Sequence, residues 1–217
     1  MALKLYCFGE SGHSYKAALA LQLSGLDWEP VYVDFFNGQT RDPDWRAEVN
    51  EMGESPVLDT GSRKISQSGV IQMEVSERSG KFGGTTPEET QEILRWILWD
   101  NAKLSTVAGP ARFLSCLVPE DKRPDAAVID WLKNRVLASY DILNRHLDGR
   151  DWIVGDGLTN ADLTCCGYLF YDEEFGFDRK AWPHIDAWLD RIAAMPGWKH
   201  PYDLMPPAHP MNQKGAA

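Results

Sequence analysis

The pattern of the chain changes near residue 80, and this change constrains the fold more than any other feature. Before it, short strand-like segments alternate with helix-like segments, which indicates an α/β layer. From Pro87 onward the sequence is helical in period or irregular. A stretch rich in Gly and Thr, 80–86, separates the two parts. We therefore expect an α/β domain over residues 1–80 and an all-helical domain over residues 87–217.

The first eighty residues predict the element order βαβαββα. Apolar residues recur at helical spacing between His13 and Ser24, and Gly25 follows where a helix commonly ends. Residues 60–62, Thr-Gly-Ser, separate two strand-like runs and indicate a hairpin. The expected strands are 4–7, 29–34, 56–59 and 63–65, and the expected helices are 13–24, 43–50 and 68–77.

The second part of the chain carries the signals of packed helices. Two long helices each have an apolar side, formed by Ile93, Trp96, Ile97 and Leu104 in one and by Val128, Trp131, Leu132, Val136 and Leu143 in the other. Thr159 and Asp162 have the spacing of a capping box that opens a third helix, and a last helix spans 185–195. The tail after it contains five prolines, so we expect it to drape over a surface without regular helix.

Composition excludes several classes of function. The 22 basic and 32 acidic side chains give a net charge of −10, whose field repels nucleic acid and anionic membranes. The chain has no run of about 18 apolar residues, and its N-terminus lacks the features of a signal peptide. Its four cysteines form no C-x-x-C pair, and its histidines lack the spacing of metal ligands. These observations predict a cytoplasmic protein with reduced thiols and no metal.

Four separated motifs stand out along the chain: Ser11 in a strand-to-helix loop, Glu-Ser-Pro-Val-Leu at 54–58, Ser-Gln-Ser-Gly-Val-Ile at 66–71, and the capping box at 159–162. Together they resemble the cytosolic glutathione transferase superfamily, in particular bacterial serine-type members. Their mutual spacing also fits the family, and the resemblance covers nearly the whole chain. It implies a thioredoxin-like domain that binds glutathione, followed by an all-helical domain that carries the second-substrate site, in a homodimer.

The resemblance also assigns binding residues. The bond before Pro56 would be cis, a form that costs about 0.5–1 kcal/mol before proline, and would turn the backbone N–H and C=O of Ser55 toward glutathione. Ser68, which we expect to cap a helix, would hold the γ-glutamyl carboxylate. Gln67 would contact the same end of glutathione, although the family more often has Glu there. Asp100 matches an acidic residue that reaches the glutathione ammonium of the partner subunit.

A serine near the start of the first helix is sufficient to activate the glutathione thiol. Lowering a thiol pKa from about 8.5 by about two units requires roughly 2.7 kcal/mol. One hydroxyl hydrogen bond to a charged group supplies about 1.5–3 kcal/mol, and a helix N-terminus adds about 0.3–1 kcal/mol. Counting back from Gly25 without gaps, Ser11 falls on the catalytic position of serine-type members, and Ser14 falls on a second serine of the zeta class.

Three other residues remain open as activators of the thiol. The same count places Cys7 where tyrosine-type members have their tyrosine, with Tyr6 one residue away on the opposite strand face. His13 falls where beta-class members carry a cysteine, which leaves no cysteine there for a mixed disulfide.

The function that the resemblance implies is conjugation of the glutathione thiolate to a small, hydrophobic electrophile in detoxification. The alternatives are a glutathione-dependent disulfide reductase or isomerase, and a non-catalytic binding or regulatory protein with the same fold. A zeta-class isomerase is disfavoured, because zeta-class members have the sequence Ser-Ser-Cys where this chain has Ser-Gly-His, at 11–13.

Overall fold

The computed structural model describes residues 2–173, 175 and 178–209, and its contacts divide the chain into two compact units. Unit 1 comprises Met1–Gly83 together with the segment that begins at Pro196, and unit 2 comprises Gly84–Met195. The division between Gly83 and Gly84 falls inside the stretch 80–86 that the sequence marks as a linker.

Unit 1 is built on a four-stranded mixed sheet in the order β2-β1-β3-β4. The strands are β1 (Leu3–Cys7), β2 (Trp28–Tyr32), β3 (Val57–Asp59) and β4 (Lys64–Ser66). β1 pairs in parallel with β2 and antiparallel with β3, and β3 and β4 form the predicted hairpin. Parallel strands need a crossover connection, which α1 (Gly12–Ser24) provides between β1 and β2.

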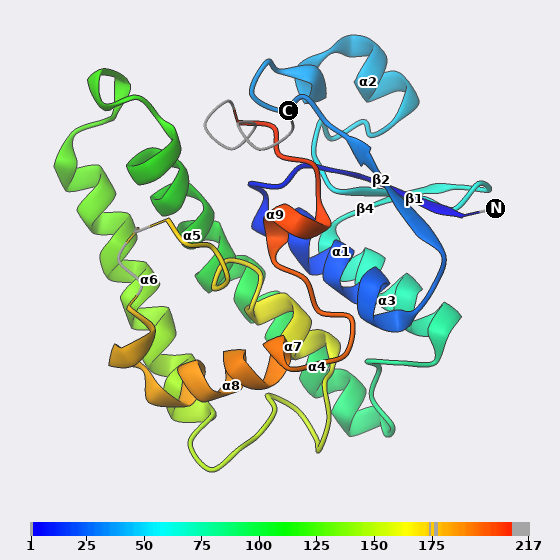
Figure 1. Ribbon diagram of the computed structural model, residues 1–217, viewed down its shortest axis with the longest axis vertical. Coiled ribbons are helices and arrows are strands. Elements are labelled where there is room, and N and C mark those ends of the chain that lie inside the picture. Colours follow the sequence, from blue (N-terminus) through cyan, green and yellow to red (C-terminus); the bar gives the residue numbers. More distant parts are fainter. Residues whose placement is uncertain (1, 174, 176–177, 210–217) are drawn as a thin grey trace. The chain divides into compact units, whose positions relative to one another are not determined.

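Helices cover both faces of this sheet (Figure 1). α1 packs against α3 (Ser68–Ser79) on one side, and α2 (Pro43–Glu48) lies on the other side. Side chains along β1 alternate accordingly: Leu5 and Cys7 are fully buried, whereas Tyr6 packs edge-on against Trp45 of α2, with ring centroids 5.7 Å apart. The observed order βαβαββα is that of a thioredoxin-like domain, as predicted.

The C-terminal segment belongs to unit 1, which differs from the sequence analysis. The Tyr15 hydroxyl donates to the carbonyl of Lys199 at 2.9 Å, and the Gly9 N–H donates to the carbonyl of Pro206 at 2.7 Å. The segment also contains a short helix, α9 (Pro201–Leu204), where no regular helix was expected. Proline is compatible with the first position of a helix, because the N–H that it lacks has no intrahelical partner there.

Unit 2 is all-helical, as predicted. Its α-helices are α4 (Pro87–Trp99), α5 (Ser105–Arg112), α6 (Ala126–His146), α7 (Asn160–Cys165) and α8 (Pro183–Ala193). Two π-helical turns, Asp100–Leu104 and Phe113–Leu117, flank α5. Along the described part of the chain, no helix has the length and apolar character required to cross a membrane.

The capping box at the start of α7 is confirmed. The Asp162 carboxylate accepts the N–H groups of Thr159 and Ile153, the Thr159 hydroxyl and the indole N–H of Trp188, at 2.9–3.0 Å. Burial raises the pKa of Asp162, and these four hydrogen bonds oppose that shift.

The expected apolar side of α6 is correct only in part. Leu132, Val136 and Leu143 are buried, but Val128 is 45% exposed and Trp131 is 57% exposed. Arg135 lies over the exposed ring of Trp131, with its guanidinium carbon 4.9 Å from the ring centroid.

Candidate active site

A pocket of about 260 Å³ in unit 1 gathers four of the residues that the sequence assigned to glutathione binding. Ser55 and Pro56 reach it from the segment before β3, and Gln67 and Ser68 reach it from the start of α3. Four further residues complete the lining, namely His13, Phe35, Gly53 and Glu54. The pocket therefore joins loops that are far apart in the sequence.

The Ser55–Pro56 bond is cis, as expected. The Ser55 hydroxyl donates to the carbonyl of Tyr6 at 3.1 Å, which ties this loop to β1. The Asn50 side chain donates to the carbonyl of Glu54 at 3.1 Å. The two residues that precede Pro56 are thus held by side-chain hydrogen bonds.

Gly53 is the one pocket residue whose backbone excludes a side chain. Its φ is +68°, and a Cβ at this position would lie 2.8 Å from the carbonyl oxygen of Thr40 and 2.8 Å from the Arg46 guanidinium. A glycine is therefore needed for this turn to close the pocket wall.

Gln67, not Ser68, is the N-cap residue of α3, which corrects the sequence analysis by one position. Its backbone lies at φ +69° and ψ 115°, a conformation that costs a non-glycine residue about 1–3 kcal/mol. The Gln67 amide donates to the Glu54 carboxylate at 2.7 Å. Gln67, whose backbone is strained, therefore lines the pocket, and its side chain is held by Glu54, which also lines the pocket.

The start of α3 is suited to binding a carboxylate. No side chain caps it, and its first turn contains no acidic residue. The first N–H groups of a helix have no intrahelical partner and carry the positive end of the helix dipole. Ser68, the first residue of α3, is buried and lines the pocket. The pocket therefore offers backbone N–H groups and a hydroxyl to an anion.

Ser11 is the N-cap residue of α1, and its hydroxyl oxygen accepts the N–H of Ser14 at 3.1 Å. Ser11 is only 8% exposed, and Ser14 is fully buried. Within the described residues, the Ser14 hydroxyl has no hydrogen-bond partner. Neither serine is among the residues that line the pocket, but His13, which lies between them in the sequence, is.

The three competing activators of the thiol are disfavoured on physical grounds. Burial raises the pKa of the Cys7 thiol to about 12, so that this thiol stays protonated. Burial, together with the positive charge of Lys16, lowers the pKa of His13 to about 3, so that this imidazole is neutral and a poor base at neutral pH. Tyr6 packs edge-on against Trp45, on the other face of β1 from Cys7.

Asp100 is not among the residues of this pocket. It lies in unit 2, is fully buried, and both of its carboxylate oxygens accept the Ser105 hydroxyl, at 2.9 and 3.0 Å. Its assignment to glutathione remains a prediction.

The sequence analysis missed Phe35, Gly53 and Glu54 as pocket residues. Glu54 is the first residue of the motif at 54–58 and Gly53 directly precedes it, so proximity in the sequence was an available signal. Phe35 had no such signal, since it reaches the pocket from the segment after β2 and is positioned by stacking on Phe8, with ring centroids 4.6 Å apart.

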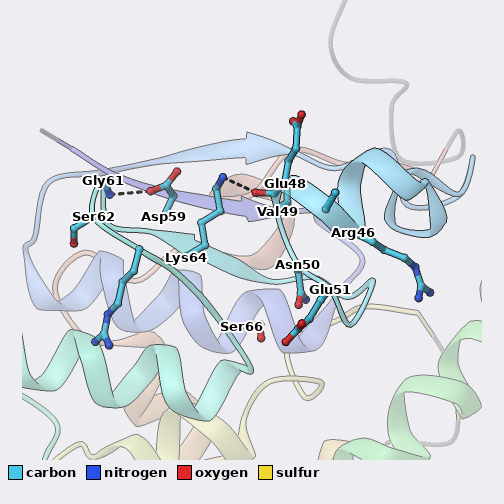
Figure 2. A pocket seen from close by; sticks show the side chains of 12 residues that line it. Arg46, Glu48, Val49, Asn50, Glu51, Asp59, Gly61, Ser62, Lys64 and Ser66 are labelled. Carbon is cyan, nitrogen blue, oxygen red and sulfur yellow. Dashed lines mark hydrogen bonds between the residues drawn. The ribbon is translucent and has the colours of Figure 1, made fainter.

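A second, more polar groove of about 530 Å³ lies between the end of α2 and the β3–β4 hairpin. In Figure 2 the Lys64 side chain reaches from β4 to the Glu48 carbonyl, to which it donates at 2.7 Å. At the hairpin turn, the Asp59 carboxylate accepts the Gly61 N–H at 2.8 Å. Charges of both signs line this groove, and none of the predicted site residues is among its lining residues.

Among the residues that the structure describes, no three His, Cys, Asp or Glu side chains group in a way that could hold a metal ion.

A thioredoxin-like unit with a cis-proline pocket and a separate all-helical unit define the glutathione-transferase class of fold. The model of the glutathione S-transferase N-terminal domain matches residues 1–73, and that of the C-terminal domain matches residues 110–196. The chain belongs to the cytosolic glutathione S-transferase family.

Three similar proteins illustrate the range of this family. A possible glutathione S-transferase from Rhodopseudomonas palustris is 30% identical, with a TM-score of 0.87 and coverage of 100% of this chain and 96% of that one. Glutathione S-transferase F10 of Arabidopsis thaliana is 26% identical, over 86% of this chain and 90% of its own. The disulfide-bond oxidoreductase YfcG of Escherichia coli (strain K12) is 23% identical, over 87% of this chain and 89% of its own.

Proposed function

We propose that this protein is a glutathione transferase, which adds the thiolate of glutathione to a small, hydrophobic electrophile in the cytoplasm. The observation that carries the proposal is the pocket of unit 1, where the cis Ser55–Pro56 loop faces the uncapped start of α3. The Ser55 backbone would bind the cysteinyl segment of glutathione. The first turn of α3, with Ser68 and Gln67, would bind its γ-glutamyl end.

We assign activation of the thiol to Ser11. The Ser11 oxygen already accepts the N–H of Ser14, which leaves the hydroxyl proton available to donate to a thiolate. A hydrogen bond of this kind to a charged group contributes about 1.5–3 kcal/mol. Ser14 is the second candidate, because its buried hydroxyl has no partner among the described residues.

We also propose a homodimer as the working form. Val70 and Met73 are exposed, with 51% and 54% of their surface accessible, and lie three residues apart on α3. In unit 2, Leu94 and Leu98 are exposed and lie four residues apart on α4. Apolar pairs of this kind are suited to burial against a second copy. Sedimentation should show a dimer that Met73→Glu or Leu98→Glu weakens.

Asp100 is a secondary part of this proposal. Its carboxylate would have to leave the Ser105 hydroxyl to meet the ammonium of a glutathione molecule. Titration of Asp100→Asn with glutathione tests the assignment, since an unchanged Kd excludes it.

A glutathione-dependent disulfide reductase is the second candidate, and the similarity to a disulfide-bond oxidoreductase favours it. The Cys7 thiol stays protonated, and His13 occupies the position where beta-class members carry a cysteine. Bound glutathione itself would therefore have to supply the reactive thiol. The third candidate, a binding or regulatory protein, would keep the pocket without turnover.

Two assays on the same preparation separate these functions. Retention on immobilised glutathione tests binding, and turnover of chlorodinitrobenzene against hydroxyethyl disulfide distinguishes conjugation from disulfide reduction. We expect retention and conjugation. Retention without turnover of either compound would favour the binding protein, and failure of retention would refute the proposal.

A further inference from the structure

Glu10 is a buried carboxylate that holds the C-terminal segment against the loop before α1. One of its oxygens accepts the N–H of Ala208 and the other accepts the N–H of His209, both at 2.9 Å. We call the segment Met205–His209 the strap. Hydrogen bonds to an ionised carboxylate are stronger than those between neutral groups, so this pair fixes the strap firmly.

The strap packs closely on the loop that it covers. The Gly9 N–H donates to the Pro206 carbonyl at 2.7 Å, and a Cβ at Gly9 would lie 3.2 Å from the Cα of Pro207. Ala208 is buried in a cluster with Phe8, Val33 and Trp45. The contact between strap and loop is therefore formed by backbone, carboxylate and apolar groups together.

This loop leads directly to Ser11. The N–H of Ser11 donates to the Phe8 carbonyl at 3.2 Å, so that the loop closes as a turn. Phe8 stacks on Phe35, which lines the pocket. The strap, the loop, Ser11 and one wall of the pocket thus form one continuous set of contacts within unit 1.

We propose that Glu10 is a positioning residue for the reaction: by holding the strap, it fixes the Phe8–Ser11 loop and, with it, the position of the Ser11 hydroxyl. This inference rests on the proposed function, with Ser11 as the donor to the thiolate. A hydroxyl that is already held in position donates a more effective hydrogen bond to a thiolate than a mobile one, because the protein does not have to reorganise when the charge forms.

Two substitutions weaken the hydrogen bonds between Glu10 and the strap, one by changing the acceptor and the other by removing a donor. Glu10→Gln leaves one acceptor oxygen and replaces the other with an NH2 group, which cannot accept an N–H. Ala208→Pro removes one of the two N–H donors and leaves the carboxylate unchanged. Ala208→Gly is the matched control, because it keeps the N–H. Glu74→Gln controls for general destabilisation, because it breaks the bonds of a buried carboxylate to Arg63 and Arg78 elsewhere in unit 1.

The readouts are hydrogen exchange at residues 208 and 209, the pKa of the bound glutathione thiol, and kcat against KM. We expect faster exchange at both amides in Glu10→Gln, and at His209 in Ala208→Pro, because proline has no N–H at position 208. In both variants we expect a raised thiol pKa, and kcat lowered about tenfold with KM changed less than about twofold, as for lost positioning. Glu74→Gln should change none of these.

Faster exchange with an unchanged thiol pKa and kcat would overturn the inference, and so would unchanged exchange in both variants. Ser11→Ala, measured in parallel, separates this failure from failure of the proposed function. If Ser11→Ala raises the thiol pKa and the strap variants do not, only the role of Glu10 is wrong. If the wild-type protein itself does not lower the thiol pKa, the proposed function fails.

Discussion

The two helices that begin near the candidate site, α1 and α3, differ in how their N-termini are capped. α1 begins at a side-chain cap, since Ser11 accepts the Ser14 N–H, and the loop before it is held by the strap. α3 begins without a side-chain cap, after a strained Gln67, and opens onto the pocket. A serine cap holds its hydroxyl in one position, and the hydroxyl proton can then donate to a ligand. A helix start without a side-chain cap leaves several backbone N–H groups available to bind an anion. The difference agrees with our proposal, in which α1 carries the thiol chemistry and α3 binds the carboxylate.

The largest expected effect is that of Ser11→Ala on catalysis. Loss of about 1.5–3 kcal/mol of thiolate stabilisation should lower kcat/KM for conjugation about 10- to 150-fold. Because the variant also removes the cap of α1, the free energy of unfolding should fall by about 1 kcal/mol. Steady-state kinetics and urea titration measure the two effects, and the Kd for glutathione should change little. Unchanged kcat/KM would show that another group activates the thiol.

Gln67→Gly should separate stability from binding at α3. Glycine relieves about 1–3 kcal/mol of backbone strain and loses about 0.4–1 kcal/mol through greater freedom of the unfolded chain, so the free energy of unfolding should rise by about 1 kcal/mol. Loss of the side chain should weaken glutathione binding about two- to tenfold. Calorimetry and denaturant titration measure these effects.

Phe82→Gly is the matched control for this variant, because Phe82 has a φ of +65° outside the pocket. Its affinity for glutathione should equal that of the wild-type protein. Weaker binding in both variants would show that loss of a side chain in unit 1 disturbs the pocket indirectly.

Acid should destabilise the protein through His13. Below pH 6.5 the unfolded chain binds a proton at His13 that the folded chain does not bind until about pH 3, because burial and Lys16 disfavour the imidazolium. The free energy of unfolding should therefore fall as the pH falls through this window, and His13→Asn should reduce the slope.

The smallest expected effect is that of Ser14→Ala, with kcat/KM lowered less than about threefold. Its hydroxyl has no partner among the described residues, so its removal breaks no known hydrogen bond of the protein. A loss as large as that in Ser11→Ala would transfer the role of donor to Ser14.

Much of the fold could be predicted from the sequence because its signals are local. Gly25 after the first helix, the Thr159–Asp162 spacing and the turn at 60–62 each act within a few residues, and the structure has a C-cap, a capping box and a hairpin there. The same holds for the cis bond before Pro56, which the resemblance implied and the structure contains.

The remaining features depend on contacts between residues far apart in the chain. The position of the tail depends on Glu10, which accepts N–H groups some 200 residues away, at Ala208 and His209, and no local pattern indicates this. The backbone of Gln67 likewise follows from the loop around Glu54 and not from its own preference. Val128 and Trp131 match a helical period but lie on the exposed side of α6, because spacing alone does not say which side packs.

The ammonium of Lys64 has a consequence for the behaviour of the protein in concentrated solution. β4 is one of the two edges of the sheet, and an exposed edge offers unpaired backbone groups to the strands of other molecules. Lys64 extends from this edge to the Glu48 carbonyl and places a positive charge where a foreign strand would have to pair. Lys64 thereby opposes edge-to-edge pairing of the sheet at β4.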